Sequence, residues 1–335
     1  MDNNNEEDFI DLENNSEQLE SNSLANPKKN SCLGSILKFL LVLFLIIVTI
    51  AGTAAWTILA RVDFDPKMAK GSFFSALFDA EQSKKDVINV LLIGMDNRSK
   101  TDKGRTDTMM IATVNKLTKK IKLTSFMRDL YVEIPEHDGN RLNTAYPKGG
   151  SLLLQKTLMN NFGASTNGYM AVDFEMFQKI VEQIGGVKME LRQEEITYLK
   201  ERMGKKVQKL VPGMNLLNGA TALEYARARY VGNGDYERTL RQRKLLQEIF
   251  HEVKALNLLK QVKLAYTIMP MIKTDLSKGD LVRLAFTVLM MDTEELETFR
   301  IPIDDSFKER RIRGMSVLVP DLAINKQALA AFLAK

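Results

Sequence analysis

The hydrophobic pattern divides the chain into one long uncharged stretch and a following series of short apolar runs. No charged residue occurs from Phe39 to Ala60, and this length is about what a helix needs to span a bilayer. Three short apolar runs then follow at 87–93, 109–115 and 121–126. Runs of this kind are typical of buried strands. The pattern therefore predicts a membrane helix and, after it, a domain that opens with three strands.

The middle of the chain alternates between a helical period and further strand-like runs. Ser151 and Asp173 each precede an amphipathic stretch and are expected to cap helices, the first of which ends at Gly163. Strands are expected at 169–172 and 187–191. The alternation continues to the C-terminus. It predicts an α/β fold, an α-β-α sandwich with a central mixed β-sheet.

These boundaries predict four segments. Residues 1–38 are expected to form a disordered acidic cytoplasmic tail with a juxtamembrane segment, 39–60 a single transmembrane helix, 61–85 a linker, and 86–335 an extracytoplasmic domain. Basic residues lie on both sides of the uncharged stretch, and we favour the orientation with the N-terminus inside. A cleaved signal peptide is the alternative, but its apolar core should be shorter and followed by a small-residue cleavage pattern.

Charge is unevenly distributed along the chain. Residues 1–27 carry eight of the 42 acidic residues and none of the 47 Lys and Arg, so the net charge is −8 there and +13 on the rest. A basic body attracts polyanions, which could be nucleic acid, anionic lipid or a phosphate-rich glycopolymer. The only cysteine is Cys32, which excludes an intrachain disulfide, and the only histidines are His137 and His251. Any catalysis is therefore expected to depend on Asp, Arg and Glu.

Charged residues flank the three predicted strands. They are Asp96, Arg98, Arg105, Asp107, Arg128 and Asp129. If these strand ends share one edge of a sheet, the Asp oxygens there suit Mg²⁺ and the Arg guanidiniums suit phosphate oxygens. The alternative is that they are solvated loop charges in ordinary ion pairs.

A second charged group lies further along the chain. A helix from about Gly219 is expected to bring Arg227 and Arg229 to its C-terminal end, and Asp235 is expected to cap the next helix. On a helical period, one face of that next helix carries Arg238, Gln242, Leu245, Leu246, Ile249 and Val253. A polar head above an apolar face suits a ligand with a phosphate group and a hydrocarbon tail. The alternative is an amphipathic core helix whose first turn emerges into water.

Both charged groups lie in stretches that resemble the LytR-CpsA-Psr proteins of bacterial cell envelopes. The resemblance covers roughly residues 87–333 and is carried by LLIGMDNR, by GRTDTMMIATVN, by SFMRDLYVEIP with the following LNTAY, and by ALEYARARY with the later GDYERTLRQRKLL. The order and spacing of all four stretches make it specific. The chain departs from the usual pattern beside the candidate site residues, at Thr106, Met127 and Tyr236-Glu237.

The resemblance implies a membrane-anchored, outward-facing enzyme. It would transfer a glycopolymer, such as a teichoic acid or a capsule, from a polyprenyl-pyrophosphate lipid to a peptidoglycan hydroxyl. By motif position, Asp96 and Asp107 would hold Mg²⁺ against the pyrophosphate. The candidate catalytic residues are Arg105, Arg128, Asp129 and Asp235, the two Asp by orienting arginines or by assisting proton removal. The candidate substrate-binding residues are Arg227, Arg229, Arg238 and Gln242.

Two other functions are consistent with the same residues or with the family's older names. A pyrophosphatase would use the same groups with water as the acceptor. A non-catalytic envelope regulator or transcriptional attenuator would need no reaction at all. Binding to nucleic acid is not expected, since no helix-turn-helix or base-stacking motif is visible and an outward-facing domain would not meet DNA.

Overall fold

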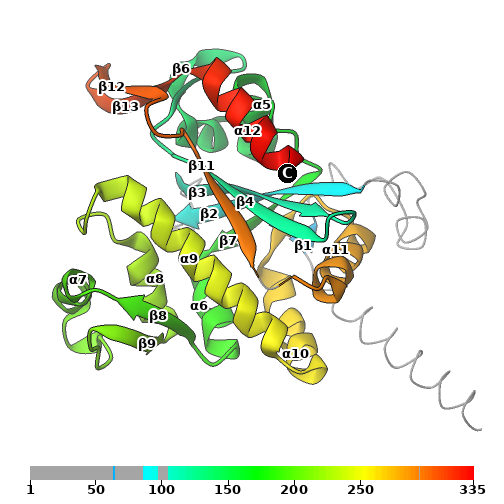
Figure 1. The fold of residues 1–335 in the computed structure, drawn as a ribbon, viewed down its shortest axis with the longest axis vertical. Coiled ribbons are helices and arrows are strands. Elements are labelled where there is room, and N and C mark those ends of the chain that lie inside the picture. Colours follow the sequence, from blue (N-terminus) through cyan, green and yellow to red (C-terminus); the bar gives the residue numbers. More distant parts are fainter. Residues whose placement is uncertain (1–62, 65–85, 97–104, 294) are drawn as a thin grey trace, which may run out of the picture. The chain divides into compact units, whose positions relative to one another are not determined.

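Seven strands form a mixed central sheet in the computed structural model, which describes residues 63–64, 86–96, 105–293 and 295–335 (Figure 1). In their order across the sheet they are β1 (Asp63–Phe64), β10 (Lys273–Thr274), β7 (Gly168–Asp173), β2 (Val87–Asp96), β3 (Arg105–Asn115), β4 (Lys120–Phe126) and β11 (Leu296–Ile301). β2, β3 and β4 are antiparallel neighbours, whereas β7 runs parallel to β2 and β11 runs parallel to β4. The predicted mixed sheet is thereby confirmed.

The predicted tail and membrane helix lie outside the described residues, as does most of the predicted linker. No helix within the described ranges combines the length and the hydropathy that crossing a bilayer requires. Two residues of the expected linker, Asp63 and Phe64, form the edge strand β1, which pairs in parallel with β10. The prediction of a linker over the whole of 61–85 is therefore revised, because the sheet already begins at Asp63.

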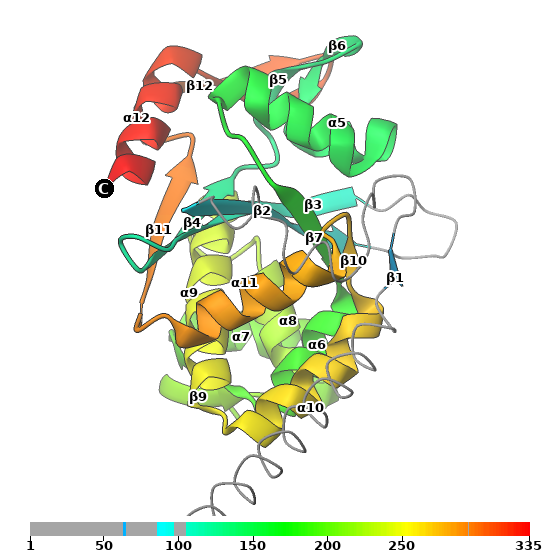
Figure 2. The same ribbon diagram turned by 90° about the vertical axis from the view of Figure 1, so that its right-hand side faces the viewer.

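Helices cover both faces of the sheet (Figure 2). One face carries α5 (Ala145–Phe162) and α12 (Leu322–Ala334). On the other side of the sheet lie α6 (Phe174–Gln183), α7 (Gln193–Met203), α8 (Gly219–Arg227), α9 (Gly234–Ala255), α10 (Leu258–Ile268) and α11 (Lys278–Met290). Helices on two sides of one sheet confirm the predicted layers.

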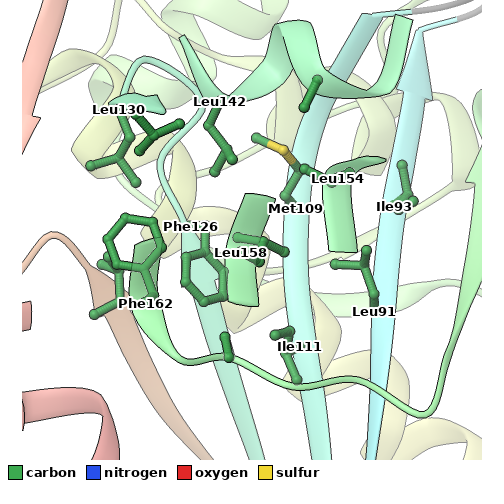
Figure 3. Packing of buried hydrophobic residues seen from close by; sticks show 14 of the residues in the cluster. Leu91, Ile93, Met109, Ile111, Phe126, Leu130, Leu142, Leu154, Leu158 and Phe162 are labelled. Atoms are coloured by element: carbon green, nitrogen blue, oxygen red, sulfur yellow. The ribbon is translucent and has the colours of Figure 1, made fainter. Parts of the chain in front are cut away.

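The core beneath α5 follows from alternation along the strands. Leu91 and Ile93 of β2 and Met109 of β3 point toward α5, where they meet Leu154 and Leu158 (Figure 3). Val90, which directly precedes Leu91, instead packs with Leu276 and Leu281 on the opposite face. Because both faces of these strands are covered, their sequence is apolar without interruption.

Smaller units surround the sheet. β8 (Val187–Leu191) and β9 (Gly213–Leu217) form a two-stranded antiparallel sheet whose core is shared with α7, α8 and α9. Hairpins pair β5 (Tyr131–Ile134) with β6 (His137–Arg141) and β12 (Phe307–Ile312) with β13 (Met315–Pro320). Three short 3₁₀ helices connect elements, η1 (Leu142–Thr144), η2 (Gly204–Lys206) and η3 (Met269–Met271).

Three predicted helix ends can be compared with the structure. The Asp173 side chain accepts a hydrogen bond from the Met176 amide and caps α6, as predicted. α5 starts earlier than predicted, at Ala145, but its backbone breaks at Gly149 and Gly150, so the segment that begins at Ser151 is its second part. The cap of α9 is Asn233, and the predicted capping role of Asp235 is wrong because its carboxylate is used in the ion pairs described below.

Candidate functional site

Three segments that are distant in the sequence bring their charged residues to one edge of the sheet. Asp107 lies near the start of β3, Arg128 and Asp129 follow β4, and Asp235 and Arg238 lie in the first turns of α9. The backbone after β4 is fixed on both sides. The Met127 amide donates to the Ile301 carbonyl at 2.9 Å, and the Asp129 carbonyl accepts from the Leu318 amide at 2.9 Å.

The Arg128 guanidinium joins these segments. Its Nη1 donates to Asp107 Oδ1 at 2.8 Å, and its Nε donates to Asp235 Oδ2 at 2.9 Å and lies 3.4 Å from Asp129 Oδ2. Burial acts against the charge of Arg128, but Asp235, Asp129 and Asp107 raise its pKa overall. The second oxygen of Asp107 accepts from Arg229 Nη2 at 2.8 Å. Burial opposes the ionisation of Asp107, yet Arg128, Arg229 and Arg238 lower its pKa, so this carboxylate is ionised at neutral pH.

Arg238 is the most deeply buried of these arginines, with 3% of its surface exposed. Its Nη2 pairs with Asp235 Oδ2 at 3.0 Å, while its Nε and Nη1 have no hydrogen-bond partner among the described residues. Burial, reinforced by the charges of Arg128 and Arg229, lowers the pKa of Arg238 to about 10. A buried cation with free donors is costly unless an anion meets it. This side chain is therefore a candidate anion-binding group.

Asp129 and Asp235 form a coupled carboxylate pair beside Arg128. Burial raises the pKa of Asp129, and the hydrogen bond and negative charge of Asp235 raise it further, against the effect of Arg128 and Arg141. Burial also acts on Asp235, but Arg238 and Arg128 lower its pKa. Arg141, the last residue of β6, pairs with Asp129 at 3.2 Å. It was not predicted as a site residue because the polar sequence of β6 lacks the apolar alternation that indicates a strand. Of the two carboxyl groups, Asp129 therefore binds a proton more readily than Asp235.

An apolar cavity of about 490 Å³ extends from this charged edge between the sheet and the helices α6, α8 and α9. Its volume is within the range of small-molecule sites. Its polar end is formed by Asp107, Arg229, Arg238 and Gln242. The apolar residues that line it include Leu92, Met110, Phe177, Ile180, Leu245, Leu246 and Ile249. Except for Val253, the face of α9 predicted from its helical period lines this cavity.

Glycine 219 allows two walls of the cavity to approach each other. A Cβ atom at Gly219, the first residue of α8, would lie 2.6 Å from the backbone carbonyl oxygen of Gln178 in α6. Real side chains do not fit at that distance, so only glycine permits this contact. α6 and α8 thus pack backbone to backbone along the cavity.

Gln242 and Arg227 line the cavity in different ways. Gln242 Nε2 donates to the Ala226 carbonyl at 3.2 Å, which links α9 to the end of α8. Arg227 pairs with Glu224 at 3.5 Å, and its guanidinium carbon lies 4.7 Å from the centre of the Phe174 ring. Arg227 is therefore in the cavity wall, whereas its ion pair is with Glu224 and not with Asp107.

Known proteins are similar to this chain in sequence and in fold. The profile described as the LytR_cpsA_psr family matches residues 61–331. The chain belongs to this family. TagU of Enterococcus faecalis, named a polyisoprenyl-teichoic acid–peptidoglycan teichoic acid transferase, is 31% identical over 255 residues, which cover 75% of this chain and 80% of TagU. MsrR of Staphylococcus aureus, named a regulatory protein, is 29% identical over 250 residues, or 73% of this chain and 74% of MsrR.

A solved structure is also similar. TagT bound to LIIa-WTA aligns with a TM-score of 0.63 at 25% identity and covers 83% of this chain and 99% of that chain. The sheet with helices on both faces is therefore the fold of a LytR_cpsA_psr domain.

Two candidate residues of this LytR_cpsA_psr domain are described only by their backbone. Asp96, at the end of β2, pairs in register with Arg105, at the start of β3. A cation would thus have Asp107 as its described carboxylate, and the described ranges hold no cluster of three or more Asp, Glu, His or Cys fit for a metal. Mg²⁺ is usually held by one or two carboxylates together with phosphate oxygens and water. The ionised, partly exposed Asp107 fits that requirement.

A buried network behind the site was not visible in the sequence. Arg241 has 2% of its surface exposed and pairs with Glu195 and Glu237, each at 3.3 Å. Its Nη2 donates to the carbonyls of Ala228 at 2.9 Å and Val231 at 3.1 Å, on either side of Arg229. Arg241 therefore positions the loop that carries Arg229.

The cavity also contains polar residues that sequence reasoning missed. Tyr198 and Arg202 of α7 line it, and both contact Glu224, the tyrosine hydroxyl at 3.0 Å and the Arg202 Nε at 3.2 Å. Burial and this hydrogen bond raise the pKa of Tyr198 to about 12, so its hydroxyl is a donor. The residues of α7 were not assigned to any element from the sequence, so no signal placed them near the site.

Proposed function

We propose that this chain is a membrane-anchored phosphotransferase that moves a glycopolymer from a polyisoprenyl-pyrophosphate carrier to peptidoglycan. The N-terminus would lie in the cytoplasm and the domain outside the cell membrane. The observation that carries the proposal is the buried Arg238, which lines the polar end of an apolar cavity and keeps two donors without a hydrogen-bond partner among the described residues. The 31% identity to TagU, whose name describes this transfer, supports the same reaction.

The two parts of the site match the two parts of such a donor. Arg128, Arg229 and Arg238 would bind the pyrophosphate, because guanidiniums at one point neutralise charge on several phosphate oxygens. The hydrocarbon chain of the lipid would lie in the cavity, in contact with Leu246 of α9 and Phe177 of α6. Arg227 would form part of the cavity wall near the head group. Gln242, which donates to the Ala226 carbonyl, would do the same. Arg105 belongs to the proposed phosphate-binding set by its motif position.

Asp96 and Asp107 would hold Mg²⁺ next to the pyrophosphate. A bound Mg²⁺ supplies positive charge that stabilises the phosphate oxygens of the leaving group. Asp107 is already ionised and is held by Arg128 and Arg229. These two arginines would fix the orientation of the carboxylate, which lines the cavity.

Asp129 is proposed to accept the proton of the peptidoglycan hydroxyl. The hydroxyl oxygen forms a bond to the glycan-side phosphorus, the bridging P–O bond breaks, and the lipid leaves as polyisoprenyl phosphate. The hydroxyl proton moves to an Asp129 oxygen. A raised pKa makes the Asp129 carboxylate a stronger base than that of an ordinary aspartate. Asp235 would hold Arg128 and Arg238 in place during this step.

Transfer can be tested with the full chain in vesicles that contain a polyisoprenyl-pyrophosphate glycan. Peptidoglycan fragments and Mg²⁺ are added, and mass spectrometry follows the covalent product. We expect transfer that falls at least 100-fold in Arg238→Gln, with little change in Arg310→Gln, an exposed arginine of β12. Activity unchanged in Arg238→Gln would contradict the proposal.

Hydrolysis is the second candidate, since water could replace the acceptor in the same geometry. The two reactions differ in their response to the acceptor. Glycan phosphate released at a rate that peptidoglycan fragments do not change would indicate a pyrophosphatase. Release that requires the fragments and yields the joined product indicates the transferase.

A further inference from the structure

The outer side of α10 is apolar where a surface helix is normally polar. The side chains of Leu258, Leu259, Val262 and Tyr266 are 71%, 81%, 39% and 40% exposed. Residues 258, 262 and 266 are each one turn apart, so they form one face. The opposite side packs inward through Leu264, which is 5% exposed. α10 thus has a buried apolar side and, facing away from the protein, a second apolar side.

The charged residues of α10 and of the segments that flank it in the sequence have one sign. Between Glu252 and Asp275 the chain contains no acidic residue and four lysines, Lys254, Lys260, Lys263 and Lys273. Lys260 and Lys263 are exposed beside the apolar face. Leucine and tyrosine flanked by lysine are typical of helices that lie in the surface of an anionic bilayer, where the apolar side enters the headgroup boundary and lysines meet lipid phosphates.

The sheet topology places α10 close to the expected anchor. α10 leads through η3 into β10, and β10 pairs with β1, with Asp63 opposite Lys273. The predicted membrane helix ends at Ala60, three residues before Asp63. Three residues span about 10 Å at most. If 39–60 crosses the bilayer, the β1–β10 pair, and the end of α10 joined to it, must lie near the membrane surface.

We infer that α10 lies in the membrane–water interface and binds anionic lipid through Leu258, Leu259, Val262 and Tyr266 with Lys260 and Lys263. This contact is separate from the proposed transfer reaction and rests on the predicted anchor. It has a geometric consequence for the cavity, because α10 packs against α6, which supplies Phe177 and Ile180 to the cavity wall. A domain held at two points cannot turn freely, so the cavity stays near the bilayer that contains the lipid donor.

The position of α10 relative to the bilayer can be measured with a fluorescent label on the full chain. Cys32→Ser removes the only cysteine, and Leu259→Cys then carries an environment-sensitive dye. The matched control is Met159→Cys, an apolar residue 51% exposed on α5, across the sheet from α10 (Figure 2). Both proteins are reconstituted into phosphatidylcholine vesicles with and without phosphatidylglycerol. Nitroxide-labelled lipid quenches a dye in the bilayer, and iodide quenches a dye in water.

We expect nitroxide lipid to quench the dye at position 259 and not at 159, more strongly with phosphatidylglycerol. Quenching at 259 by iodide alone would place α10 in water and overturn the inference. If neither quencher reaches position 259, protein covers the face. A cross-link between two Leu259→Cys chains would then identify a second copy, and its absence would identify another segment of the same chain. Either result would overturn the inference.

A kinetic measurement separates membrane contact from a structural role. Leu258→Gln with Leu259→Gln changes two exposed side chains, so folding should be unaffected. We expect KM for the lipid donor to rise several-fold in phosphatidylglycerol vesicles and to stay unchanged in detergent micelles, with kcat unchanged in both. An equal rise in micelles would contradict the inference. The labelling result does not depend on activity, so failure of the proposed reaction leaves it interpretable.

Discussion

Arg128 Nε donates to Asp235 Oδ2 at 2.9 Å, although the two residues are 107 positions apart in the chain. This bond joins the end of β4 to the first turn of α9, and with it the charged edge of the sheet to the helix that lines the cavity. The head-group site and the lipid site are therefore parts of one arrangement, and each can be tested by its own substitution.

Arg128→Lys should reduce transfer by about 100-fold or more, because one ammonium cannot reproduce the guanidinium contacts to Asp107 and Asp235. The measurement is the rate of product formation by the full chain in vesicles. Arg310→Lys, on exposed β12, is the matched control. A loss of only two- or three-fold would mean that Arg128 serves mainly to hold the fold together.

Leu246→Trp should weaken binding of the lipid by filling the cavity that Leu246 lines. Leu240→Trp makes the same change on a different face of α9, at a position that is 38% exposed. Native mass spectrometry of the full chain with a polyisoprenyl pyrophosphate measures bound lipid directly. Equal occupancy in the two variants would show that the chain of the lipid lies elsewhere.

Asp107→Asn and Asp129→Asn should change stability with pH in opposite directions. The pKa of Asp107 is below the ordinary value of 3.8, so its ionised form stabilises the fold above that pH and this contribution disappears as pH falls through the lowered pKa. Asp107→Asn is therefore expected to be less stable than the parent at neutral pH, with a difference that shrinks in acid. Thermal unfolding of the full chain in detergent, from about pH 3 to pH 7, measures this.

Asp129 has the reverse sign because its pKa is raised. Its contribution is fully present below pH 3.8 and is lost as pH rises through the raised pKa, so Asp129→Asn should gain stability relative to the parent on going to neutral pH. If Asp129 is the base, transfer by the parent should also fall as pH decreases through that pKa, and the residual rate of Asp129→Asn should lack this dependence. Parallel stability profiles for the two variants would contradict the assignment.

Arg241→Met should lower the free energy of unfolding by about 3 kcal/mol, because it removes the buried charge partner of Glu195, which keeps only its contacts with Arg192. Adding Glu195→Gln should recover part of that loss. Lys244→Met, an exposed residue of the same helix, is the control. Since Arg241 also holds the backbone on both sides of Arg229, lipid-pyrophosphate affinity should fall as well; a variant with parent affinity would show that the loop is held by other contacts.

The sequence predicted those features that depend on a local period. The face of α9 with Arg238, Gln242 and Leu246 follows from 3.6 residues per turn, and these residues line the cavity. The cap at Asp173 is likewise local, because its side chain accepts a hydrogen bond from the amide of Met176, only three residues further along the chain. Such features require no knowledge of the rest of the chain.

Features set by distant partners were not predictable in the same way. Asp235 has the residue type and position of a helix cap, but two arginines, one of them 107 residues away, use its carboxylate instead. β1 has two residues and exists only because β10 pairs with it. Arg241 resembles any charged residue of an amphipathic helix until the loop carbonyls of Ala228 and Val231 are placed beside it.

The pairing of Asp107 and Asp235 with Arg128, Arg229 and Arg238 also bears on how a catalytic cycle ends. Each carboxylate is a permanent competitor for the guanidiniums that a phosphate must occupy. Under the proposed function, a pyrophosphate would share the guanidiniums with these aspartates, and the lipid monophosphate left after transfer carries less negative charge with which to compete. Release of the product, and with it turnover, would then be assisted by groups that are already in the site.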